Sequence, residues 1–148
     1  MKIQKATKKD FKEYYYMNNE MLKEYSETIR KKIQILGEKK SGKIFKKIIS
    51  NKKSCLLLAK EREACGYLYG TIFENPFNTG GYIEDIMVLK KYRKKKIGRK
   101  LIKEFANILK KRKLNKILLS VNIKNKKAFN LYKNTGFKII KYDMEKRI

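Results

Sequence analysis

The chain has 148 residues, and 42% of them are hydrophobic, which suits one domain of ordinary size with a real core. Its formal net charge is +26, from 40 Lys and Arg against 14 Asp and Glu. It has no histidine and two cysteines, which excludes Ser-His and Cys-His catalysis and argues against a metal site.

The positive charge comes mainly from lysine and is spread over the whole chain. Arginine, which offers a bidentate fork to base edges and phosphates, occurs at only six positions. A coding bias toward A and T would give this profile without any binding role. The alternative is a role in attracting nucleic acid, phosphate or anionic surfaces. In either case the field of the protein draws in anions.

The start of the chain, Met1 to Thr7, lacks the apolar core of a signal peptide, and no segment is long enough to span a bilayer. We therefore expect a cytoplasmic protein without membrane contact, in which Cys55 and Cys65 stay reduced.

The spacing of apolar residues predicts the elements of the first fifty residues. These are a short strand over 2–6 and helices over 8–24, 26–36 and 42–50. Thr7 and Asp10 can cap the first helix, and Gly37 lies just beyond the second.

After residue 53, short apolar runs bounded by charged or turn residues indicate strands. The charged Lys60 to Glu63 joins two of them as a hairpin, and turn residues cluster from Asn75 to Gly81. The predicted elements are strands over 55–59, 66–73 and 82–89, a helix over 97–112, a strand over 117–121, a helix over 126–135 and strand segments over 137–147. This order predicts a single α/β domain over 1–148, with a mixed, mostly antiparallel central sheet and helices on its faces.

Residues 93–98 lead from a predicted strand into a predicted helix. A helix N-terminus exposes unpaired backbone N–H groups and carries partial positive charge, so such a loop can hold a diphosphate. Lys94, Lys95, Lys96 and Arg99 add side-chain charge at the same place. The alternative is a basic surface turn like others in this lysine-rich chain.

Two motifs give this turn a more specific meaning. The first is Tyr82-Ile-Glu-Asp-Ile-Met-Val88 followed by Arg93-x-x-x-x-Gly98, and the second is Asn125-x-x-Ala-x-x-x-Tyr132-x-x-x-Gly-Phe137. Together they resemble the GNAT superfamily of acyl-CoA N-acyltransferases over about residues 64–140. The usual turn of that family, Arg/Gln-x-x-Gly-x-Gly/Ala, differs here in having Lys96 at its first glycine.

The resemblance implies a GNAT-like sheet that splays between the strands 82–89 and 117–121. It implies that residues 1–50 form the acceptor side and 54–140 the half that binds acetyl-CoA. Backbone amides from about Lys94 to Arg99 would hold the diphosphate. The implied cofactor-binding residues are Met87 and Val88, which pair with the pantetheine arm, Asn125, which touches it, and Arg93, Lys94, Lys95, Lys96, Ile97, Gly98 and Arg99.

The resemblance also implies the catalytic groups. Glu84 would be the base, directly or through water, and Tyr132 the acid that meets the thioester sulfur. Because Glu84 and Asp85 are neighbours on a strand, we expect their side chains on opposite faces, with Asp85 binding the acceptor or lying on the other side of the sheet. The alternatives are a solvated strand end for the acidic pair and a packing role for Tyr132.

We therefore expect an N-acetyltransferase that moves an acetyl group from acetyl-CoA to a primary amine by direct attack, without a metal. The motifs look particularly like members that acetylate small polyamines or amine-bearing antibiotics. Rival interpretations are a basic nucleic-acid or ribosome-associated binding module and a catalytically weak CoA-binding sensor. Edge strands near the C-terminus could pair between copies and form a homodimer.

Overall fold

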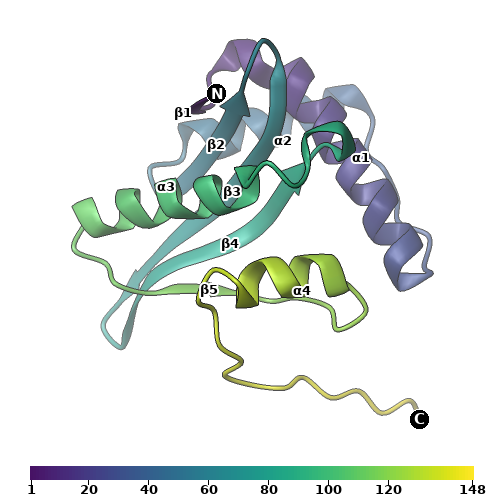
Figure 1. Cartoon of the computed structure of the whole chain (residues 1–148), viewed down its shortest axis with the longest axis vertical. Coiled ribbons are helices and arrows are strands. Elements are labelled where there is room, and N and C mark those ends of the chain that lie inside the picture. The colour runs from purple at the N-terminus through teal and green to yellow at the C-terminus, as the bar shows by residue number, and fades with distance from the viewer.

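A five-stranded mixed sheet lies at the centre of the computed structural model, which describes residues 1–148 (Figure 1). Its strands are β1 (Lys2–Lys5), β2 (Ser54–Lys60), β3 (Ala64–Asn75), β4 (Asn78–Val88) and β5 (Ile117–Leu119), in that spatial order. The first four are antiparallel neighbours, and β5 pairs with β4 in parallel. The prediction of a mixed, mostly antiparallel sheet is confirmed.

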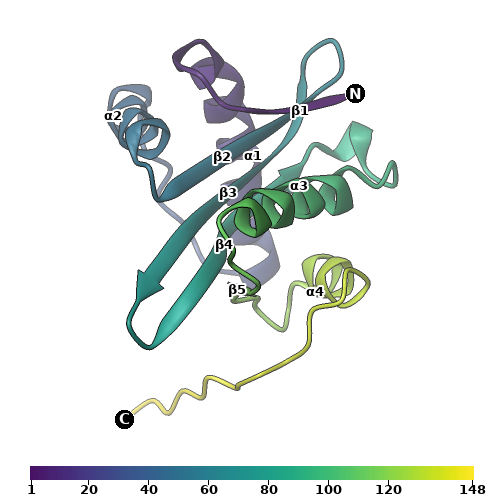
Figure 2. The same ribbon diagram turned by 90° about the vertical axis from the view of Figure 1, so that its left-hand side faces the viewer.

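Helices cover both faces of this sheet (Figure 2). They are α1 (Phe11–Ile29), α2 (Glu38–Ser50), α3 (Ile97–Lys111) and α4 (Lys126–Lys133), with short 3-10 turns at Lys8–Asp10 and Lys90–Tyr92. One core cluster joins α1 and α2 to the sheet through Met17, Phe45 and Tyr67. A second cluster on the other face joins α3 through Leu101 and Phe105. The sheet is therefore buried on both sides, which explains its continuous apolar runs.

Two predicted elements were wrong. The predicted helix 26–36 does not exist, because α1 continues to Ile29 and ends where Arg30 adopts a left-handed conformation, with φ of 54°. The Arg30 N–H then bonds to carbonyls of the last turn, which closes the helix.

The alternation over 137–147 produces no strand. Residues 138–148 form no backbone hydrogen bond, and Ile140 and Met144 are 76% and 95% exposed. Alternation alone cannot form a strand without a neighbour to pair with.

The glycines of the sheet let α3 approach it closely. A Cβ on Gly70 would lie 2.5 Å from the ring of Phe105, which is fully buried. We predict that Gly70→Ala destabilises the protein by about 1–3 kcal/mol, the usual cost of overpacking. Gly42 in α2 is the control, since a Cβ there meets Phe11 at an ordinary 3.4 Å. Gly42→Ala should stabilise the helix by about 0.5–1 kcal/mol. Urea unfolding measures the change in the free energy of unfolding, which should be negative for Gly70→Ala and positive for Gly42→Ala.

Candidate active site

A β-bulge in β4 brings the two acidic residues to one face of the sheet. Tyr69 pairs with Asp85 and the next residue, Gly70, pairs with Ile83, so Glu84 is the extra residue on β4. Asp85 therefore lies on the face of its partner Tyr69. Glu84 accepts a hydrogen bond from Thr71 Oγ1 at 2.7 Å, and Thr71 belongs to the same face. The prediction that the pair would point to opposite faces was wrong, because a bulge interrupts the alternation of side chains.

The two carboxylates differ in their surroundings. Glu84 is exposed, whereas Asp85 is half-buried and has neither a hydrogen bond nor an ion pair. Burial raises the pKa of Asp85 above the usual range, and the nearby charge of Glu84 adds to the effect. An unpaired carboxylate of this kind readily accepts a proton.

Tyr132 lies on α4, seven residues after a helix cap. The side chain of Asn125 accepts a hydrogen bond from the Ala128 N–H at 3.1 Å, which is an ordinary cap. The Tyr132 side chain is 9% exposed and packs edge-on against Phe137. Its hydroxyl has no hydrogen-bond partner within the protein. Every side-chain nitrogen or oxygen that is wholly buried does have such a partner, so the hydroxyl oxygen of Tyr132 is not wholly buried. The hydroxyl is therefore reached from outside and is free to donate.

Burial raises the pKa of Tyr132 to about 12, and the negative charge of Asp85 is the second cause. The hydroxyl therefore keeps its proton at neutral pH. Tyr132 also lines a cavity of about 1620 Å³ between α3, α4, β5 and the residues that follow α4. This cavity reaches Tyr82, whose hydroxyl donates to Ser120 Oγ at 2.8 Å.

The sheet opens beside this cavity. β4 pairs with β5 only over Gly81–Ile83, so the rest of β4 has a free edge. The Leu89 N–H donates to the Cys65 carbonyl of β3, and the direction of the backbone N–H and C=O groups alternates along a strand. The backbone groups of Met87 are therefore directed toward β3, and those of Ile86 and Val88 toward the free edge. The family resemblance implied Met87 and Val88 together, but adjacent strand residues direct their backbone groups to opposite edges, so Ile86 shares the free edge with Val88.

The turn before α3 presents a row of unpaired backbone donors. No backbone N–H from Lys94 to Arg99 bonds to another group of the chain. Lys94 and Lys96 both adopt left-handed conformations, with φ of 64° and 61°. These donors lie at the N-terminus of a 15-residue helix, so the helix dipole adds positive potential.

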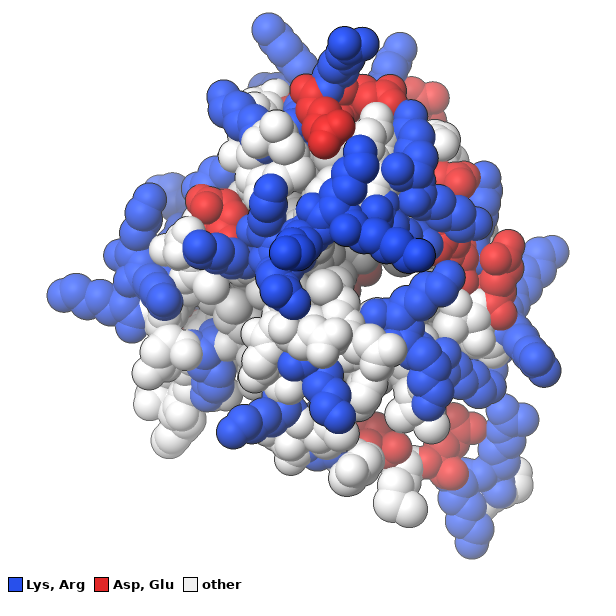
Figure 3. Space-filling model, viewed as in Figure 1, with Lys and Arg blue, Asp and Glu red and all other residues white.

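Lys and Arg side chains gather over this turn and the first turns of α3 (Figure 3). Lys94, Lys95, Lys96 and Arg99 are all exposed there. Backbone donors, helix dipole and side-chain charge therefore coincide in one place, an arrangement suited to a diphosphate.

Arg93 holds the turn in place. Its Nε donates to the Val88 carbonyl at 2.8 Å, and one terminal nitrogen lies 2.8 Å from both carboxylate oxygens of Glu24. The guanidinium thus joins the turn to the end of β4 and to α1. Its Nε and one terminal nitrogen are engaged within the protein, so Arg93 positions the backbone donors of the turn.

Lys96 occupies a glycine-type conformation. A residue other than glycine in the left-handed conformation costs about 1–2 kcal/mol of folded-state free energy. Replacing it with glycine removes this cost but gives the unfolded chain more conformational freedom, so only part of the gain remains. We predict that Lys96→Gly raises the free energy of unfolding by about 0.5–1 kcal/mol. Lys95 lacks a positive φ, so Lys95→Gly should lower the free energy of unfolding by a similar amount. Chemical denaturation tests this, and equal effects of the two changes would contradict it.

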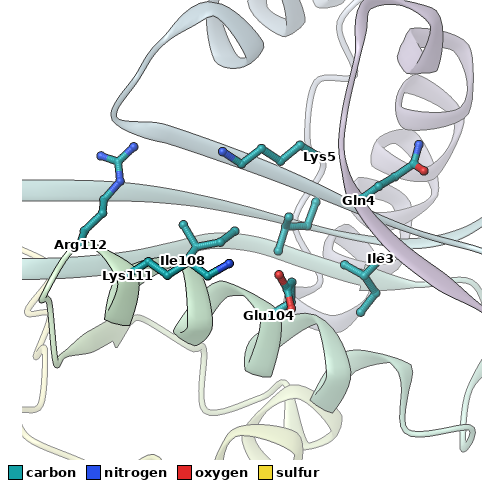
Figure 4. A pocket seen from close by; sticks show the side chains of 8 residues that line it. Ile3, Gln4, Lys5, Glu104, Ile108, Lys111 and Arg112 are labelled. Atoms are coloured by element: carbon teal, nitrogen blue, oxygen red, sulfur yellow. The ribbon is translucent and has the colours of Figure 1, made fainter.

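A second, smaller cavity lies apart from these residues. It has a volume of about 390 Å³ and lies between β1, β2 and α3, with Lys5, Glu104, Lys111 and Arg112 around it (Figure 4). It contains none of the predicted site residues. No group of three or more Asp, Glu and Cys side chains is placed to hold a metal ion. None of the helices combines the length and the hydropathy that a membrane span requires.

A splayed mixed sheet with an N–H-rich turn at a helix start defines an acyltransferase-like fold. The sequence profile of the Acetyltransferase (GNAT) family matches residues 13–137. The chain belongs to this family, as the two motifs indicated.

Individual proteins resemble this chain in sequence or in fold. A mouse (Mus musculus) thialysine N-epsilon-acetyltransferase is 40% identical over 72 residues, which are 48% of this chain and 42% of that protein. Among solved structures, a tetramutant of the BH1408 protein from Bacillus halodurans has a TM-score of 0.88 at 22% identity, covering 100% of both chains. An aminoglycoside 6'-N-acetyltransferase from Acinetobacter haemolyticus has a TM-score of 0.78 at 18% identity, covering 100% of this chain and 99% of that one. A predicted acetyltransferase with acetyl-CoA from Clostridium acetobutylicum has a TM-score of 0.80 at 19% identity, covering 99% and 95%.

Proposed function

We propose that this protein transfers an acetyl group from acetyl-CoA to a primary amine by direct attack of the amine. The observation that carries this proposal is the run of six unpaired backbone N–H groups from Lys94 to Arg99 at the start of α3. Such a run is an anion site, and it lies at the end of the strand that carries the acidic pair. Acetyl-CoA supplies both the diphosphate and an activated acetyl thioester.

The residues of the chain would hold acetyl-CoA in two places. The backbone donors of Lys94 to Arg99, with the charges of Lys94, Lys95, Lys96 and Arg99, would bind the diphosphate. The free edge of β4 would pair with the amides of the pantetheine arm through Ile86 and Val88. The Val88 carbonyl already accepts from Arg93, so its N–H is the group left for the ligand. The side-chain amide of Asn125, whose oxygen is used in the cap, keeps its N–H₂ to touch the same arm.

Amine acetylation needs two proton transfers, and the site offers one group for each. A neutral amine must lose a proton as its nitrogen forms the new bond, and the departing sulfur must gain one. Glu84 and Asp85 lie on the same face of the sheet, and one of these two carboxylates takes the amine proton. Glu84 is the base that the family resemblance implies. Tyr132, whose proton is retained at neutral pH and has no partner in the protein, gives one to the sulfur.

The acceptor that suits this site is a small molecule with more than one amino group. Two carboxylates on one face attract positive charge at short range. The similar proteins whose names specify an acceptor act on thialysine, aminoglycosides and glucosamine-6-phosphate, and the first two of these acceptors have more than one amino group. The net charge of +26 repels a polycationic acceptor at long range. Added salt screens this repulsion, so we expect it to increase the acetylation rate at low acceptor concentration.

Thiol release from acetyl-CoA with a panel of amines tests the proposed function. We expect activity with at least one polyamine, lysine analogue or aminoglycoside, and little with neutral monoamines. Calorimetry with acetyl-CoA alone is the companion measurement. Failure to bind at millimolar acetyl-CoA and moderate salt would overturn the proposal.

A further inference from the structure

We infer that Asp85, rather than Glu84, is the carboxylate that takes the proton from the attacking amine. This inference rests on the proposed function and assigns a role within that site. It contradicts the role that the family resemblance gives to Glu84, and it follows from the bulge and from the surroundings of the two carboxylates.

Asp85 is unusual among the fourteen acidic side chains of this chain. The others either have a hydrogen-bond or ion-pair partner or are exposed to solvent. Those without a partner are Glu27, Glu38, Glu61 and Glu74, and all four are exposed. Asp85 alone is both half-buried and without a partner. In a chain with 40 Lys and Arg, a carboxylate that meets none of them stays free to act on a ligand.

Glu84 has a different setting. Thr71 Oγ1 donates to it at 2.7 Å, and its side chain is exposed to solvent. The Thr71 hydroxyl therefore already occupies one oxygen of the Glu84 carboxylate, and solvent surrounds the rest of the side chain. Glu84 therefore suits attraction and orientation of a cationic acceptor better than abstraction of its proton.

The surroundings of Asp85 place it near the other reacting group. Burial is the first cause that raises the pKa of Tyr14, Tyr67 and Tyr132, and the charge of Asp85 is the second cause at all three. Glu84 contributes at none of them. On the edge of β4 that faces away from β3, pairing ends at Ile83, so no neighbouring strand separates Asp85 from α4. Asp85 thus lies within electrostatic reach of Tyr132 and of the aromatic side chains of the acceptor side.

The proton balance closes with these two residues. The amine nitrogen forms its bond to the acetyl carbon and passes a proton to the Asp85 carboxylate. The carbon–sulfur bond breaks, and Tyr132 gives its hydroxyl proton to the sulfur. The proton on Asp85 then returns to the tyrosinate oxygen, directly or through water, and both groups regain their starting states.

The test compares Asp85→Asn with Glu84→Gln in the pH dependence of kcat/KM. We expect Asp85→Asn to lower kcat by about 10²–10⁴-fold, the usual contribution of a general base, and to remove the acidic limb of the profile. Glu84→Gln should raise KM for the acceptor and leave the acidic limb in place. Glu74→Gln, an exposed carboxylate of β3 outside the site, is the matched control and should change neither.

A second measurement separates catalysis from folding. The folded-state pKa of Asp85 is raised, so its charged form is penalised in the folded protein, and this penalty appears as pH rises above the unfolded pKa. Asp85→Asn should therefore be more stable than the wild type at neutral pH, with the difference vanishing at low pH. Acetyl-CoA affinity should be unchanged by either variant.

The outcomes are distinct. Loss of the acidic limb in Glu84→Gln but not in Asp85→Asn would overturn the inference, and so would an Asp85→Asn variant that is destabilised at neutral pH. A wild-type protein that binds acetyl-CoA and acetylates no amine would instead count against the proposed function.

Discussion

Tyr132→Phe should lower kcat by about 10²–10⁴-fold, which is the usual contribution of a general acid, while leaving acetyl-CoA affinity within a factor of about two. The change removes one oxygen and keeps the ring that packs against Phe137. Because the hydroxyl has no partner in the protein, its loss breaks no hydrogen bond of the fold. Stopped-flow thiol release and calorimetry with acetyl-CoA measure the two quantities separately.

The control for this variant is Tyr16→Phe, since Tyr16 is on α1 and 57% exposed. It should alter neither kcat nor affinity. A Tyr132→Phe protein with full kcat would show that Tyr132 is a packing residue. Equal losses in kcat and in acetyl-CoA affinity would lead to the same conclusion, because both would then follow from a displaced α4.

Arg99→Glu should weaken acetyl-CoA binding by about 10–100-fold at low salt, since it reverses a charge within a Coulombic distance of the diphosphate. Glutamate is favoured in the first turn of a helix, which offsets the loss of the exposed hydrogen bond that Arg99 donates to the Asn134 carbonyl at 3.3 Å, so the variant should still fold. Its carboxylate would itself compete for the unpaired N–H groups. The loss should shrink as salt is added, because the side chain is exposed.

Lys39→Glu provides the matched control for this charge reversal. Lys39 is also exposed and lies in the first turn of a helix, α2, outside the proposed diphosphate site. It changes the net charge by the same amount without touching the turn at 94–99. Equal weakening by the two variants would mean that binding responds to the net charge of the protein and not to a built site.

Much of the fold could be predicted because local patterns and long-range packing agree. Phe105 and Leu109 recur at helical spacing, and α3 covers the sheet with that face. The predicted helix over 126–135 is present as α4 and includes Tyr132, because its pattern depends on positions within one helix.

Other features depend on partners that no local pattern reveals. The bulge at Glu84 follows from the register between β3 and β4, so alternation along β4 alone gave the wrong face for the acidic pair. The left-handed conformation of Lys96 is normally indicated by glycine, and this chain has lysine there. The engagement of Arg93 with Glu24 joins positions 69 residues apart.

The central claim is that the backbone N–H groups of Lys94 to Arg99 bind the diphosphate of CoA. Amide ¹H–¹⁵N spectra recorded during titration with CoA, and separately with pantetheine, test it directly. We predict large shifts of these six amides with CoA and none with pantetheine, which lacks the diphosphate. CoA binding that leaves the six amides unshifted would contradict the account.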